Sequence, residues 1–414
     1  MLRPDVPPSP SPSVLLCMGT RPEVIKMAPV AHALRAAGLS PLILHSGQHN
    51  AVAYEVYRFF GLQPDVHLAL DRSRTSLGHL GARLLEGIDA VMERTPVEAV
   101  LVHGDTATTL ASAQAAYFNR IPLGHVEAGL RSHDAGDPFP EEKNREMVAR
   151  LATWHFAPTA VAARNLRDEN IPASQIYRVG NTVVDAALWG AAQVARDGSA
   201  PPAGLDVWAA SGRLVLVTAH RRESWGRPIE GIARAVARLA EAHPDLRFLW
   251  PLHPNPAIRE SVDAGLRALA GPVRDRVHLT SPLTYPRLLW ALRESWLVLT
   301  DSGGIQEEAA ALDRPVLVLR RTTERPELIE AGGGRLVGTD PATIERWVSG
   351  LATDPVAYAA LRCPENPYGD GRASERIARV LRTSLRPARL PERPPMRLVA
   401  PLSPETHPTH LPAA

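Results

Sequence analysis

The sequence predicts an α/β protein made of two similar units, each built on a parallel sheet. Short apolar runs, each followed by a turn and then an amphipathic helical stretch, recur along the 414 residues and form two separate series. A segment rich in small residues and proline, 197–212, separates the two series and is predicted to be a linker or hinge. The boundary between the units is therefore the expected position of an active site.

The individual elements follow from this pattern. The first unit is predicted to cover residues 14–196, with helices such as 23–37 and 106–118 and with strands at 14–18, 42–45, 99–103, 123–126, 155–157 and 176–179. The second unit is predicted to cover residues 213–371, with strands at 214–218, 247–250, 277–279, 297–300, 316–319 and 335–337. Prolines crowd residues 1–13 and 387–414, so both ends are predicted to be disordered tails.

Composition excludes several classes of protein. The 46 Lys and Arg against 44 Asp and Glu leave a formal charge of +2, and no stretch combines basic and aromatic residues as nucleic-acid binding requires. Cys17 and Cys363 lack the spacing of a disulfide framework or a zinc site, which fits a reducing cytoplasm. No apolar run approaches the ~20 residues that cross a bilayer, and the N-terminus has no signal-peptide core. We expect a cytoplasmic protein with no metal, nucleic-acid or membrane partner.

Polar residues directly after the predicted strands are candidates for the site, because ligands of open parallel sheets bind beyond the carboxyl ends of the strands. Thr20 and Pro22 suit the start of a helix after strand 14–18, and free N–H groups at a helix start favour an anion. Arg21 and Lys26 would add positive charge toward a phosphate. The alternative is a capped helix whose cations are solvated.

Two further candidates follow strands of the second unit. Ser302, Gly303 and Gly304 precede a helix whose first turn could hold a diphosphate, with Glu308 one turn deeper to accept hydrogen bonds from ribose hydroxyls. His220, followed by two arginines, could neutralise a departing phosphate by charge and by donated hydrogen bonds. The alternatives are an ordinary tight turn and a solvated charged surface.

Three acids are the remaining candidates: Asp105, Glu127 and Glu141. Asp105 could simply cap the helix that begins near Thr106, and Glu141 could lie in the first turn of its own helix, where the dipole favours a carboxylate. Glu127 has no evident capping role. Together, at the edge of one sheet and facing the cations of the other unit, the acids are interpreted as acid/base groups beside a diphosphate site.

A series of motifs in order over about residues 14–385 resembles the non-hydrolysing UDP-N-acetylglucosamine 2-epimerases. The motifs are GTRPEVIKMAP, VHGDTATT, HVEAGLR, PEEKNR, GNTVVDA, HRRES, HPNP, TDSGGIQEEA, TTERPE and NPYGDG. The resemblance implies two Rossmann-like domains of the GT-B type with the active site in the interdomain cleft. It also implies a final helix, about 372–386, that crosses back to the first domain, and a homodimer.

The resemblance also assigns roles by position. It gives the three acids the acid/base role and puts His220 beside the diphosphate. Contacts with the nucleotide sugar are implied for Arg21, Lys26, Ser302, Gly303, Gly304, Glu308 and Arg325. Some family members bind a second UDP-N-acetylglucosamine as an activator through a segment like Gln48 and His49. The sequence departs from the pattern at Ala219, Leu283, Leu288, Asn50 and Ala51.

The implied reaction is inversion at C2 of UDP-N-acetylglucosamine. UDP leaves C1 as the C2 proton is removed, giving 2-acetamidoglucal, and then adds back while a proton returns to the opposite face. Such chemistry needs a stabilised leaving diphosphate and carboxyl groups on both faces of the sugar, at least one of them with a raised pKa. No Gly-x-Gly-x-x-Gly follows the first strand, so nicotinamide-dependent epimerisation is disfavoured and no cofactor is expected.

Rival functions remain open at this point. A GT-B glycosyltransferase would keep the nucleotide site but needs only one main base, and a sensor of UDP-sugars could dispense with the carboxylates. A hydrolysing relative would let water trap the glucal and release the free sugar. Related epimerases act on modified UDP-hexosamines such as 2,3-diacetamido uronic acids. The three acids favour the epimerase over the transferase and the sensor.

Overall fold

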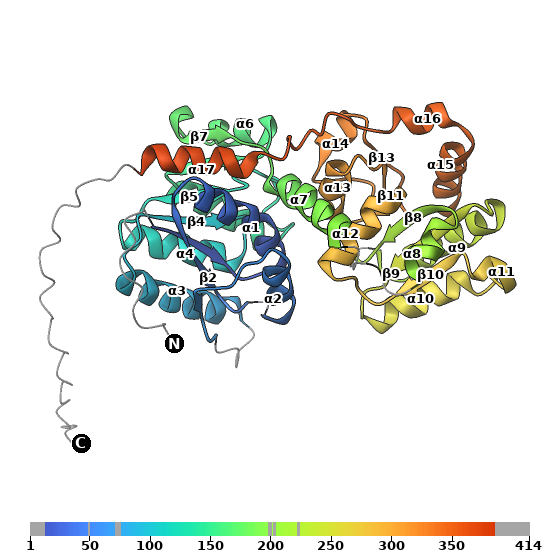
Figure 1. The fold of residues 1–414 in the computed structure, drawn as a ribbon, viewed down its shortest axis with the longest axis horizontal. Coiled ribbons are helices and arrows are strands. Elements are labelled where there is room, and N and C mark those ends of the chain that lie inside the picture. Colours follow the sequence, from blue (N-terminus) through green and yellow to red (C-terminus); the bar gives the residue numbers. More distant parts are fainter. Residues whose placement is uncertain are drawn as a thin grey trace, which may run out of the picture.

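The structure is a computed structural model that describes residues 13–48, 50–70, 76–197, 201, 204–221 and 224–385. The chain forms two α/β units that lie side by side, each around one sheet (Figure 1). The predicted fold class is therefore confirmed. The tails predicted at 1–13 and 387–414 lie outside the described residues, except that Ser13 begins the first strand and so does not belong to a tail.

The first sheet has seven strands in the order β3-β2-β1-β4-β5-β6-β7, all paired in parallel. The strands are β1 (Ser13–Met18), β2 (Ser40–His45), β3 (Val66–His67), β4 (Ala99–His103), β5 (Leu123–Val126), β6 (Trp154–Ala157) and β7 (Ile176–Arg178). The helices are α1 (Arg21–Ala36), α2 (Asn50–Phe59), α3 (Leu77–Arg94), α4 (Ala107–Phe118), α5 (Glu141–Leu151), α6 (Ala160–Asp168), η1 (Ala173–Gln175) and α7 (Thr182–Asp197). Leu16 packs with residues of α1 and α7, whereas its neighbour Leu15 packs with α3 and α4, so helices cover both faces.

The second sheet has six parallel strands in the order β10-β9-β8-β11-β12-β13. The strands are β8 (Arg213–Thr218), β9 (Leu246–Pro251), β10 (Val277–Thr280), β11 (Ser295–Thr300), β12 (Val316–Val318) and β13 (Gly334–Leu336). The helices are α8 (Leu205–Ala210), α9 (Arg227–Ala242), α10 (Pro256–Leu266), α11 (Gly271–Arg274), α12 (Tyr285–Glu294), α13 (Gly303–Ala311), α14 (Pro326–Glu330), α15 (Pro341–Thr353) and α16 (Pro355–Ala360). The strand order reverses between β1 and β4 in one sheet and between β8 and β11 in the other. Ligands of such sheets bind at these switch points.

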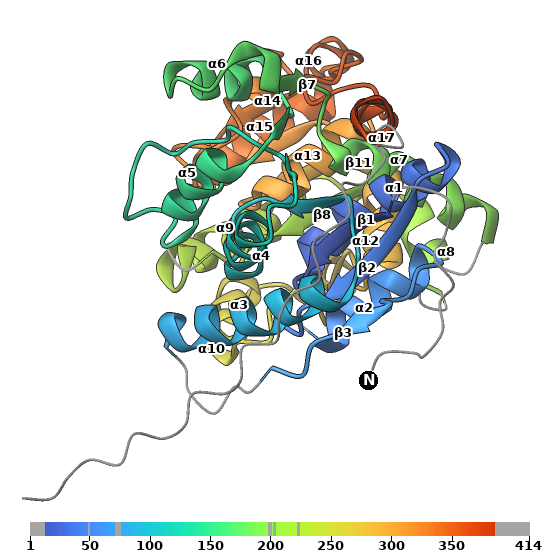
Figure 2. The same ribbon diagram turned by 90° about the vertical axis from the view of Figure 1, so that its left-hand side faces the viewer.

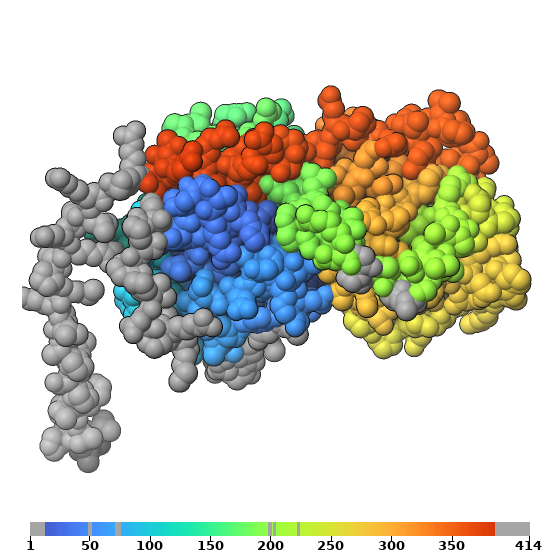
Figure 3. Space-filling view, viewed as in Figure 1, coloured from blue at the N-terminus to red at the C-terminus, as the bar shows by residue number. Residues whose placement is uncertain are grey.

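The last helix, α17 (Ala373–Ser384), returns to the first unit and packs against α1 and α7. Two views agree that it lies along the first unit, and it covers that unit's upper surface in the space-filling view (Figures 1, 2 and 3). Asp185 of α7 accepts hydrogen bonds from the backbone N–H groups of Ala373 (3.2 Å) and Ser374 (2.8 Å), so a side chain of the first unit caps the returning helix.

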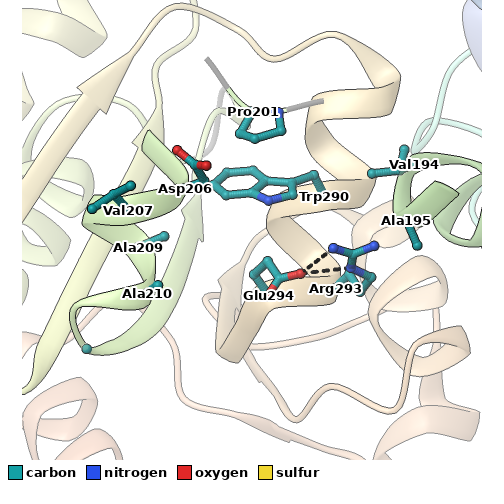
Figure 4. Close-up of a pocket in the computed structure, with 11 residues that line it drawn as sticks. Val194, Ala195, Pro201, Asp206, Val207, Ala209, Ala210, Trp290, Arg293 and Glu294 are labelled. Carbon is teal, nitrogen blue, oxygen red and sulfur yellow. Dashed lines mark hydrogen bonds and ion pairs between the residues drawn. The ribbon is translucent and has the colours of Figure 1, made fainter. Parts of the chain in front are cut away.

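The segment predicted as a linker, 197–212, is partly helical, because α8 lies within it. Leu205 and Ala209 of α8 are buried in the core that joins the two units, where α7 also packs against α12 and α13. A pocket of about 530 Å³ lies here, with Trp290 beneath Pro201 and Asp206 beside it (Figure 4). This pocket lies among α7, α8 and α12, away from the ends of β1, β4, β8 and β11 where the candidate residues are found.

Candidate active site

The predicted site residues gather at the two switch points. Thr20 follows β1 and Asp105 follows β4, whereas His220 follows β8 and Ser302 follows β11. Because the carboxyl ends of parallel strands meet at one edge of a sheet, each pair of loops is brought together by the strand order. Lys26 of α1 lies 3.1 Å from Glu307 of α13, so side chains from the two units are in direct contact.

The start of α1 is largely occupied by a side chain of the protein. The Glu23 carboxylate accepts hydrogen bonds from the backbone N–H groups of Gly19 (2.9 Å) and Thr20 (2.7 Å). Its other oxygen accepts from the hydroxyls of Thr106 (2.7 Å) and Thr109 (3.2 Å) at the start of α4. Glu23 is thus a connection between the β1 and β4 loops that the sequence analysis missed. The predicted N-cap residue Thr20 could have indicated this role of Glu23, since a Glu three residues after the N-cap is typical of a capping box.

Glu127 is a buried carboxylate with a strained backbone. It follows β5 with a φ of 64°, a conformation that is rare for residues other than glycine, and its side chain is only 4% exposed. One oxygen contacts Lys26, and the other accepts from Arg145 at 3.0 Å. Burial by itself raises the pKa of a carboxyl group, but Lys26 and the neighbouring cations outweigh burial and hold the pKa of Glu127 well below its usual range.

Asp105 joins the same group through Arg145. The Arg145 guanidinium lies 2.6 Å from Asp105 and also donates to the Glu127 carbonyl at 2.8 Å, so one cation of α5 holds both predicted acids. Asn144 donates to the Asp105 carbonyl at 2.7 Å. Asp105 does not cap α4, because the side chain that accepts from the helix start is that of Thr106. The bridging role of Arg145 depends on how α5 packs, and sequence reasoning did not find it.

Glu141 stands apart from the other two acids. It is the first residue of α5 and is half-buried, and within the described part of the chain its side chain has no hydrogen bond or ion pair. Its neighbour Glu142 is buried and accepts from the backbone N–H groups of Ser132 (2.9 Å) and His133 (3.0 Å). Glu142 therefore holds the loop that leads from β5 to α5, whereas Glu141 is left available for a ligand.

The β8 loop of the second unit is held by a buried acid. Asp301 is 0% exposed and accepts from the backbone N–H groups of His220 (2.8 Å) and Arg221 (2.9 Å). Its second oxygen lies 3.6 Å from His220 Nδ1, and that imidazole is 45% exposed. The His220 and His253 rings are stacked with their centroids 6.3 Å apart. Asp301 thus holds the backbone that carries His220 while leaving the imidazole accessible, a role that the motif TDSGG did not reveal.

The start of α13 is open to a ligand. Ser302 is the N-cap residue, and its side chain makes no capping hydrogen bond. Neither Gly303 nor Gly304 has a positive φ, so the turn itself does not require glycine. No other described atom, beyond its chain neighbours and the backbone of α13 itself, lies within 4 Å of a Cβ built on Gly304. The open space beside Gly304 therefore favours the ligand interpretation over the tight-turn alternative.

The remaining predicted residues lie in both units. Arg325 ion-pairs with Glu307, and burial raises the pKa of Glu308 to about 7 despite the opposing charge of Arg21. Gln48 accepts from the Thr108 hydroxyl at 2.9 Å, whereas His49 lies outside the described residues. Leu283 and Leu288 are partly buried against the core.

Comparisons of this chain with known sequences and with solved structures point to the same family. The model of the UDP-N-acetylglucosamine 2-epimerase family matches residues 32–382. The UDP-N-acetylglucosamine 2-epimerase of Escherichia coli K12 is 43% identical over 90% of this chain and 98% of its own length. The enzyme of the same name from Bacillus subtilis is 41% identical over 89% of this chain and 94% of its own. A crystal structure of the Neisseria meningitidis enzyme bound to UDP-GlcNAc superposes with a TM-score of 0.81 at 37% identity, covering 89% of this chain and 99% of that one.

Proposed function

Because the chain belongs to the UDP-N-acetylglucosamine 2-epimerase family, we propose that it interconverts UDP-N-acetylglucosamine and UDP-N-acetylmannosamine by eliminating and re-adding UDP. It is thus an isomerase, and the family match supports the non-hydrolysing type. The observation that carries the mechanism is the contact of Lys26 with Glu127 and Glu307, because it joins a buried acid of one unit to the nucleotide helix of the other.

The leaving diphosphate is stabilised by the second unit. The C1–O bond breaks and its electron pair leaves with UDP, so negative charge grows on the diphosphate. The N–H groups of Gly303 and Gly304 can donate hydrogen bonds to this charge, together with His220 and the cation of Arg21. Ser302 can contribute its hydroxyl, since its own N–H already donates to Thr300 at 3.0 Å. Glu308 accepts from the ribose hydroxyls, beside Arg21. Arg325 and Lys26 lie beside this helix, where both pair with Glu307.

Proton transfer belongs to the acids of the first unit. As UDP leaves, the C2 proton passes to a carboxylate and the C1=C2 double bond of the glucal forms. UDP then adds back to C1 on the face that it left, while a carboxyl group delivers a proton to the opposite face of C2, which gives the epimer. The low pKa of Glu127 keeps it ionised, so it is suited to act as a base or to stabilise positive charge at C1. Glu141, which has no partner among the described side chains, is our candidate for the proton donor on the opposite face, whereas Asp105 is held near Glu127 by Arg145.

The function is tested by incubating the protein with UDP-N-acetylglucosamine in deuterium oxide. We expect NMR to show deuterium at C2 in a mixture of UDP-N-acetylglucosamine and UDP-N-acetylmannosamine. Free hexosamine should not accumulate. Release of UDP with free N-acetylmannosamine would instead identify a hydrolysing enzyme. No exchange until an acceptor is added would identify a glycosyltransferase.

Replacing Gly304 by alanine is expected to weaken UDP binding without destabilising the fold. The added methyl group enters the space where the diphosphate approaches, and we expect a Kd at least about tenfold higher. The melting temperature should stay unchanged or rise, because no described atom outside its own helix and chain neighbours lies within 4 Å and alanine favours a helix. Gly350→Ala on α15, which also has open space, is the matched control for titration calorimetry. Wild-type affinity in Gly304→Ala contradicts the assigned nucleotide site.

We further propose a homodimer in the cytoplasm. Tyr117 and Phe118 at the end of α4 are each 63% exposed with their rings 6.2 Å apart, an apolar patch that suits contact with a second copy. A monomeric mass by light scattering would rule out the dimer. Cys17 and Cys363 are both free, which suits a reducing compartment, and none of the described helices has the length and apolar character to span a bilayer. A second nucleotide sugar is proposed to bind near Gln48.

A further inference from the structure

Glu307 is a buried acid at the contact between the two units to which no role has been given above. It lies on α13 with 1% of its surface exposed, one residue before the nucleotide-binding candidate Glu308. Its carboxylate pairs with Arg325 of its own unit, and it lies 3.1 Å from Lys26 of the first unit. Asn181, at the start of α7, donates to it at 3.3 Å. A carboxylate this deeply buried needs such partners to remain charged.

The two donors from the first unit are shared with Glu127. Lys26 contacts one oxygen of Glu127, and the Asn181 amide donates to that same oxygen at 3.3 Å. Lys26 and Asn181 therefore stand between two carboxylates, one from each unit. Asn181 is itself fixed, because its backbone N–H donates to Tyr368 at 2.8 Å and its side-chain oxygen accepts from Val183 at 3.1 Å.

The charges of this cluster are balanced. Side chains of Lys, Arg, Asp and Glu from both units form one connected set of ion pairs with three cations and three carboxylates: Lys26, Arg145, Arg325, Asp105, Glu127 and Glu307. The imidazole of His103 also lies 3.5 Å from Glu127. Removing the charge of Glu307 would leave a net positive charge around Glu127. Lys26 would then be attracted to Glu127 alone, because its second partner has lost its charge.

We propose that Glu307 is a positioning residue that restrains Lys26, so that Glu127 keeps its basicity and Arg325 keeps its orientation when the two units are in contact. This inference rests on the proposed epimerase function. Glu307 acts through these two cations and does not touch the sugar, since the cations surround it and only 1% of its surface is exposed. The consecutive acids Glu307 and Glu308 then have different tasks, because they point about 100° apart around α13.

The test is Glu307→Gln, which keeps the shape of the side chain and removes its charge. We expect kcat to fall by about tenfold, a change typical of coupled residues in one ion-pair network. We also expect UDP to bind roughly threefold more tightly, because the site gains positive charge toward the diphosphate. Glu260→Gln, an exposed acid on α10, removes one charge from the same unit as a matched control. Turnover is measured by NMR and UDP binding by calorimetry.

A merely structural role would not produce opposite changes in turnover and affinity. If folded Glu307→Gln shows unchanged kcat, or if UDP binding weakens together with kcat, the proposal is wrong. Glu307→Asp keeps the charge but shortens the reach toward Lys26, so we expect wild-type UDP affinity with an intermediate kcat. If the glutamine variant does not fold, Glu307→Asp tests the proposal instead. A wild-type kcat in Glu307→Asp would then overturn the proposal. Absence of epimerisation in the wild-type protein would instead contradict the proposed function.

Discussion

Replacing Glu127 by glutamine is expected to reduce kcat for epimerisation by about a thousandfold, within the range for loss of a positioned acid or base. Glutamine has nearly the same shape, so the strained backbone after β5 can be kept, but it cannot accept the C2 proton. Lys26 and Arg145 lose a carboxylate partner, which makes the site more positive toward a diphosphate. We therefore expect UDP to bind at least as tightly as to the wild type.

The control is Glu93→Gln, which removes the charge of an exposed acid from α3 of the same unit. Circular dichroism would verify that both variants fold. A Glu127→Gln enzyme that turns over within twofold of the wild type contradicts the assignment of Glu127 as an acid/base group. Loss of UDP binding in the folded variant would show that Glu127 binds the nucleotide and does not transfer the proton.

Replacing Asp301 by alanine is expected to affect both stability and activity. Asp301 is completely buried and accepts from the backbone N–H groups of His220 and Arg221, so its removal leaves two polar groups without a partner. Each such loss costs about 1–3 kcal/mol, and we expect the free energy of unfolding to fall by about 3 kcal/mol. We expect kcat to fall by about a hundredfold, because the loop that positions the His220 imidazole loses the group that holds its backbone.

A double-mutant cycle separates these effects. If Asp301 acts on turnover through His220, adding Asp301→Ala to His220→Asn should lower kcat little further, while the loss of stability persists. Chemical denaturation measures the stability, and NMR measures the turnover. Fully additive losses in kcat would show that Asp301 does not act through His220.

Most of the fold could be predicted from the sequence because central parallel strands are buried on both faces. Strands such as Ala99–His103 and Leu123–Val126 are short, mainly apolar and buried throughout, and their predicted bounds agree with the structure. The edge strand β3 has only two residues, one of them the exposed His67, so it gives no such signal and was missed. The helix within the predicted linker was missed for a similar reason, since six residues are too few for a clear helical period.

From the residues alone, the candidate site was predicted mainly where polar groups follow directly after a strand or lie at the start or in the first turns of a helix. Asp105, Glu127, His220 and Ser302 could be found because the ends of parallel strands meet at one edge. The residues that contact them could not be predicted. Arg145, Asn181 and Glu307 lie on or at the start of helices, and which side chain they contact depends on how those helices pack.

The sequence by itself therefore determined the two parallel sheets, the loops that carry polar groups and the family, because local periodicity and spaced motifs encode these features. The tertiary structure alone decided which charges meet. Lys26 and Glu127 are separated by 101 positions in the chain, and Glu307 lies in the other unit, yet they form one buried cluster. It also decided that the raised pKa belongs to Glu308 and that Glu127 stays ionised. The physical reason is that burial and the distance between charges set a pKa, and both depend on how remote segments pack together.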